Sequence, residues 1–228
     1  MQLVKSYRAW LQSVVTAATM LLVTTSSVIA AGDHAVGQGG NGEFFMAAIP
    51  DGWQALPRAT KAQQTSAEWL PQGQTVENWT DMITVQVFPG WAEGDVSVFL
   101  EELADIYKQN CEVSGATPPL KDQVNGFLTG FRLINCTRDL TRNSGEVSLF
   151  RALIGKNAAY LIQRVFRVPE FEIGAKPVTD EVMVKAYGSI SSVGACQLNS
   201  KQYTCADWDP ILAKLDNKPS VIVIKAPK

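Results

Sequence analysis

The sequence has very few of the residues on which most catalysis and metal binding depend. It contains one histidine in 228 residues, His34, which lies close to the N-terminus. Histidine is the usual general base near neutral pH and a common zinc ligand, so Ser-His-Asp, Cys-His and zinc sites are not expected. No P-loop, G-x-S-x-G, S-x-x-K or G-x-G-x-x-G stands in a suitable strand and helix setting. We therefore expect a protein that is not an enzyme and holds no cofactor or metal.

The sequence also has no large excess of charge of either sign. Its 20 Lys and Arg residues against 22 Asp and Glu residues give a formal net charge of -2. Such a balance supplies no broad basic field for nucleic acid, so no nucleic-acid partner is expected. A hydrophobic share of 46% with 18% charged residues is typical of an ordinary globular protein, which excludes intrinsic disorder and a multi-pass membrane protein.

Residues 1–30 have the pattern of a secretory signal peptide. Lys5 and Arg8 precede an uncharged stretch, and Val28 and Ala30 are small enough for the -3 and -1 positions of a cleavage site. Removing residues 1–30 leaves 18 basic against 22 acidic residues, a formal charge of -4. We expect residues 31–42 to be a flexible N-terminus and the mature protein to be periplasmic or, alternatively, secreted. An uncleaved membrane anchor is the other interpretation of residues 1–30.

All four cysteines lie in the expected mature chain, and an even number in an exported protein favours two disulfides. Of the three possible pairings, the sequence favours Cys111 with Cys136 and Cys196 with Cys205, because each closes a short loop. The spacing fits no metal site, and no C-x-x-C motif supports a redox role.

The hydrophobic pattern predicts one domain over residues 43–195, with a tail over residues 196–228 packed on it. Alternating or β-branched runs predict strands, and one long apolar stripe with Asp95 as N-cap predicts the first helix. Thr179 is the expected N-cap of a second helix, with Gly194 as its C-cap. The predicted strands are Glu43–Ile49, Thr65–Leu70, Asn78–Phe88, Gln123–Leu140, Glu146–Ile154, Ala159–Val168 and Ser220–Ile224, and the predicted helices are Val96–Asn110 and a segment from Thr179 to about Val193.

The phrase Phe45-x-x-x-Ile49-Pro50-x-Gly52-Trp53, together with this order of elements, resembles the PsbP-like and Ran-binding Mog-type fold. The resemblance covers roughly residues 43–193. It implies an α+β fold in which an antiparallel sheet, a meander, is sandwiched between helices. It also implies a binding or assembly module without catalysis. The two expected disulfides and the cysteine-bearing tail depart from the family pattern.

Arginine is concentrated in the predicted meander, where six of the seven arginines of the expected mature chain lie. Our binding hypothesis is that Arg132 and Arg164 help to recognise an anionic group on a partner through their planar guanidinium groups. The alternative is that the meander arginines pair with neighbouring carboxylates of Asp139, Glu146 and Glu170.

Four tryptophans lie within forty residues, and such side chains either fill a core or line a groove. Trp79 has the apolar parity of its strand, so we expect it in the core. Trp69 and Trp91 border turns and are our candidates for an aromatic binding groove.

These observations predict an exported, non-enzymatic protein-binding or envelope assembly factor whose partner is another envelope protein. The alternatives are a periplasmic small-ligand-binding protein with an aromatic groove and a carboxylate-dependent hydrolase using Asp81, Asp139, Glu146 or Glu170. The sequence does not select an oligomeric state.

Overall fold

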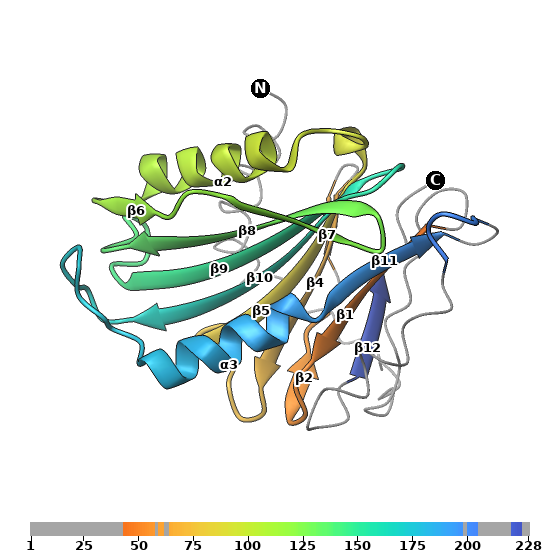
Figure 1. Ribbon diagram of the computed structural model, residues 1–228. Helices are drawn as coiled ribbons and strands as arrows, with labels where there is room; N and C mark the ends of the chain where they lie inside the picture. Colours follow the sequence, from red (N-terminus) through yellow and green to blue (C-terminus); the bar gives the residue numbers. More distant parts are fainter. Residues whose placement is uncertain (1–42, 58, 62–63, 198–199, 205–219, 225–228) are drawn as a thin grey trace.

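The computed structural model describes residues 43–57, 59–61, 64–197, 200–204 and 220–224. Within these residues the protein has an α+β fold, with a nine-stranded antiparallel sheet, a three-stranded antiparallel sheet and two α-helices (Figure 1). The α+β class predicted from the sequence is therefore confirmed. The predicted signal peptide 1–30 and N-terminal segment 31–42 lie outside the described residues.

The large sheet has the strand order β2-β4-β5-β10-β9-β8-β6, and β3 pairs with β4 while β7 pairs with β8. A second sheet has the order β11-β1-β12. The strand bounds are β1 (Glu43–Ile49), β2 (Trp53–Ala55), β3 (Ala59–Lys61), β4 (Gln64–Pro71), β5 (Asp81–Phe88), β6 (Ser114–Ala116), β7 (Leu120–Val124), β8 (Phe127–Cys136), β9 (Gly145–Ile154), β10 (Ala159–Val168), β11 (Val193–Gln197) and β12 (Ser220–Ile224). A 3-10 turn, η2 (Pro89–Trp91), follows β5.

Helix α2 (Val96–Asn110) covers one face of the large sheet and has the bounds predicted from its apolar stripe. Its N-cap is Asp95, whose carboxylate accepts a hydrogen bond from the Ser97 N–H at 2.6 Å. Seven of its fifteen residues are buried, and they pack on β8 and β9 against side chains such as Ile134 and Phe150. We call this side of the large sheet the α2 face.

Helix α3 (Asp180–Ser191) lies on the opposite side, which we call the α3 face (Figure 1). Thr179 is its N-cap, as predicted, and its hydroxyl accepts a hydrogen bond from the Val182 N–H at 3.4 Å. Ala186 and Ile190 pack against β9, β10 and β1. The small sheet lies in the same layer as α3, on the α3 face of the large sheet. Phe45 of β1 stacks there on Tyr160 of β10, with ring centroids 5.1 Å apart. The large sheet thus lies between α2 and α3, the arrangement that the resemblance implied.

The predicted long strand Gln123–Leu140 is wrong, because a tight turn divides it into β7 and β8. Asn125 and Gly126 have φ angles of 48° and 79°, and Val124 pairs with Phe127. Positive φ at both central residues is the signature of a two-residue type I′ hairpin turn, for which Asn-Gly is a favoured sequence. The turn creates the edge strand β7, which the sequence analysis missed.

The end of the second helix also differs from the prediction. Helix α3 ends at Ser191 with Ser192 as C-cap, so Gly194 does not end the helix. Gly194 lies instead in β11, paired with Met46 of β1. The β-branched run Ser220–Ile224 pairs with β1 and confirms the predicted C-terminal strand.

Candidate functional site

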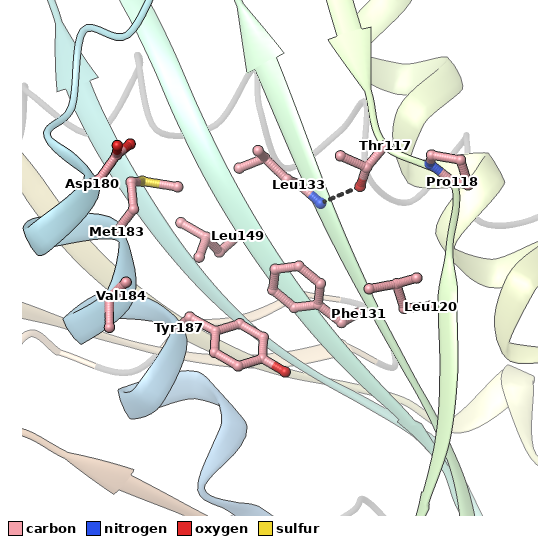
Figure 2. A pocket seen from close by; sticks show the side chains of 10 residues that line it. All are labelled: Thr117, Pro118, Leu120, Phe131, Leu133, Leu149, Asp180, Met183, Val184 and Tyr187. Carbon is pink, nitrogen blue, oxygen red and sulfur yellow. Dashed lines mark hydrogen bonds between the residues drawn. The ribbon is translucent and has the colours of Figure 1, made fainter.

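An open apolar groove lies on the α3 face, between α3 and the edge formed by β6, β7 and the loop that joins them (Figure 2). Its volume is about 640 Å³. Its side chains come from three places: the loop and β7, the strands β8 and β9, and α3. The lining residues are Thr117, Pro118, Leu120, Phe131, Leu133, Leu149, Asp180, Met183, Val184 and Tyr187.

The α3 wall of the groove follows from helical spacing. Asp180, Met183, Val184 and Tyr187 stand at i, i+3, i+4 and i+7, so they share one side of the helix. Tyr187 packs edge to face on Phe131 of the groove floor, with ring centroids 4.9 Å apart.

The opposite wall is fixed by backbone pairing at the sheet edge. The Thr117 N–H donates to the Leu133 carbonyl at 3.0 Å. The Leu133 N–H donates to the Thr117 hydroxyl at 3.1 Å (Figure 2). These two bonds hold the β6–β7 loop against β8, and Pro118 and Leu120 stand along the groove beyond it.

Much of the apolar lining is exposed to water. The exposed fraction is 70% for Val184, 62% for Leu120 and 45% for Tyr187. Asp180 is the one charged residue of the lining, and its carboxylate lies 2.9 Å from Nζ of Lys176. A continuous exposed apolar groove of this kind marks a binding surface more often than a structural feature.

The structure places Arg132 and Arg164 on opposite faces of the large sheet. Arg132 is buried on the α2 face, where Nη1 donates to the Leu100 carbonyl at 3.1 Å and lies 2.9 Å from a carboxylate oxygen of Glu101. Arg164 lies on the α3 face, where it forms a bidentate pair with Asp81 at 3.1 and 2.7 Å and donates to Ser189 at 3.0 Å. The two guanidinium groups are not brought together, and both are engaged within the protein.

Two other arginines pair with the carboxylates that the sequence analysis named as alternatives. Arg142 lies 2.8 Å from Asp139 and 2.7 Å from Glu146, and Arg138 lies 3.8 Å from Glu170.

The two tryptophan candidates are also separated by the sheet. Trp69 is 6% exposed and belongs to the core of the α3 face. Trp91 packs edge to face on Phe99 of α2 at a centroid distance of 5.3 Å. Trp79 is 4% exposed and buried, as expected, with the Arg167 guanidinium 3.9 Å from its ring centroid. Trp69 and Trp91 therefore do not line one groove.

Asp139 and Glu146 are the two candidate carboxylates that the structure brings together, on either side of Arg142. Burial raises the pKa of Glu146. Burial would also raise the pKa of Asp139, but the Thr141 hydrogen bonds and the Arg142 charge lower it below its usual value. Asp81 is held by Arg164 on the other face. Within the described residues, no three His, Cys, Asp or Glu side chains converge in a way that would hold a metal ion.

The Cys111–Cys136 disulfide predicted from the sequence is present, with a Cα separation of 5.5 Å. Cys196 is also disulfide-bonded, but its proposed partner Cys205 lies outside the described residues. Disulfides persist in oxidising compartments, which supports an exported protein. In the described part of the chain, neither helix is long and apolar enough to span a membrane.

The residues of the groove were missed by the sequence analysis, although part of the signal was present. The segment Val182 to Tyr187 carries more apolar residues than one sheet-facing stripe of a helix needs. The other wall could not be found in this way. Leu120 lies outside every strand and helix predicted from the sequence, and the hairpin turn at Asn125 and Gly126 places it at the sheet edge.

No protein-family model matches the sequence, and no curated protein matches it. Among solved structures, the chain is similar to LpqN of Mycobacterium tuberculosis, a protein described as involved in cell envelope biogenesis. The match has 10% sequence identity and a TM-score of 0.36, and it covers 70% of this chain and 88% of that one.

Proposed function

We propose that the protein is an exported, non-enzymatic binding factor of the cell envelope that holds an apolar segment of a partner protein in the groove on the α3 face. The observation that carries this proposal is the open groove itself, with Leu120, Val184 and Tyr187 exposed along it. Exposed apolar area of this kind is stabilised when a partner removes it from water, at roughly 25 cal/mol per Å² before the costs of association.

The openness of the groove favours a protein partner over a small ligand. Small-molecule sites surround most of the ligand surface. Here the side chains of Val184 and Leu120 stand in water along the walls, so a small molecule would leave much of its own surface exposed. A protein segment would cover the walls as well as the floor.

The absence of catalysis is part of the same proposal. Asp139 and Glu146 are both close to Arg142, at 2.8 and 2.7 Å, and both are more than nine-tenths buried. Such a buried, charge-paired arrangement is well suited to holding the C-terminal end of α2 and poorly suited to reaching a substrate. We also propose that the protein is periplasmic. The PsbP-like resemblance implies a binding or assembly module, which agrees with this role.

The test is native purification of the mature protein from its own envelope fraction, with mass spectrometry of what stays bound. We compare the wild-type protein with Val184→Glu in the groove and with Val76→Glu, a control at an apolar residue that is 49% exposed and does not line the groove. We expect a stoichiometric protein partner with the wild type and the control, and its loss with Val184→Glu. A partner retained equally by both variants would contradict the proposal. A retained small molecule without a protein would favour the small-ligand alternative.

A further inference from the structure

We draw no further inference here: the strongest candidate, the apolar groove between α3 and the sheet edge formed by β6 and β7, belongs to the site already described, and nothing in the structure shows what covers it.

Discussion

The two faces of the large sheet are covered in different ways. On the α2 face, a fifteen-residue helix buries seven side chains, and the Cys111–Cys136 disulfide ties the residue after its last turn to β8. On the α3 face, a twelve-residue helix has two buried side chains, Ala186 and Ile190, and leaves Val184 and Tyr187 exposed above an apolar floor. Among its large apolar side chains, α2 leaves Val98 exposed, whereas the shorter α3 leaves Val182, Val184 and Tyr187 exposed.

This difference separates residues that maintain the fold from residues available for binding. On the α2 face, loss of a contact should appear in the free energy of unfolding. On the groove side of α3, it should appear in partner binding and leave folding almost unchanged. This distinction would be contradicted by a variant on the α2 face that changes only partner binding. It would also be contradicted by a variant on the groove side of α3 that changes mainly the free energy of unfolding.

The largest effect is expected from removal of the Cys111–Cys136 disulfide. The two cysteines are 25 residues apart, and closing a loop of that size stabilises the fold by about 3.5 kcal/mol in the chain-entropy description. The double variant Cys111→Ala, Cys136→Ala should lose about this much in denaturant unfolding monitored by tryptophan fluorescence. A loss below about 1 kcal/mol would show that the α2 face does not depend on the covalent link.

Matched truncations on the two helices sharpen the comparison next. Leu103 of α2 is fully buried, so Leu103→Ala should cost about 3 kcal/mol through lost contacts and the cavity left behind. Val184 of α3 is 70% exposed, so Val184→Ala should change the free energy of unfolding by less than about 0.5 kcal/mol. Both values come from urea unfolding of the purified protein. Comparable losses in the two variants would mean that Val184 contributes to folding as Leu103 does.

The α2 face was the easier of the two to predict from the sequence. The period of its apolar residues and the cap at Asp95 are local signals, and they gave α2 with both of its ends. The strands β9 and β10 followed from their alternating or β-branched runs, with Gly145 as the one additional residue. These elements are determined by short-range pattern, so a single sequence contains the information needed.

The groove depends on contacts between distant segments, and local pattern does not contain them. Leu120 becomes a wall only because the turn at Asn125 and Gly126 folds β7 onto β8, and Leu149 of β9 joins the floor through pairing with Leu133. The sequence alone could not show that Arg132 and Arg164 lie on opposite faces, for a related reason. Strands alternate their side chains between faces, and the relative parity of β8 and β10 is set by their pairing through β9.

A pH titration tests the polar end of the α2 face, where Asp139 pairs with Cys111 of the disulfide in an isolated β-bridge. The Asp139 carboxylate accepts hydrogen bonds from the Thr141 hydroxyl at 2.6 Å and from Arg142 Nη2 at 2.8 Å. Asp139→Asn should cost about 2 kcal/mol at pH 7, the scale of hydrogen bonds to a charged group. Because the folded pKa of Asp139 is lowered, this stabilisation is present above the unfolded value of about 3.9 and is lost as pH falls through the folded pKa.

The neighbouring Glu146 supplies the control for that titration. Burial raises its folded pKa, so its contribution favours folding at low pH and is lost as pH rises through the folded pKa, the opposite slope to that of Asp139. Measuring Asp139→Asn in a Glu146→Gln background removes the opposing slope. The difference between the paired proteins should then shrink steadily below about pH 4. A difference that stays constant down to pH 2 would show that Asp139 acts through its shape and neutral hydrogen bonds.

The smallest effects are expected from two glycine-to-alanine substitutions, one on the α2 face and one in α3. They should change the free energy of unfolding in opposite directions. A Cβ on Gly130 of β8 would lie 2.8 Å from Leu100 and 2.9 Å from Val96, two buried side chains of α2, so Gly130→Ala should destabilise by about 1–2 kcal/mol through overpacking. A Cβ on Gly188 would meet nothing, so Gly188→Ala should stabilise the isolated protein by about 0.5–1 kcal/mol through helix propensity alone. Chemical denaturation of both variants without a partner gives the two values. The two free-energy changes should have opposite signs because β8 is already packed against α2, whereas the side of α3 at Gly188 is open. Destabilisation by Gly188→Ala would mean that this side of α3 is already filled in the free protein.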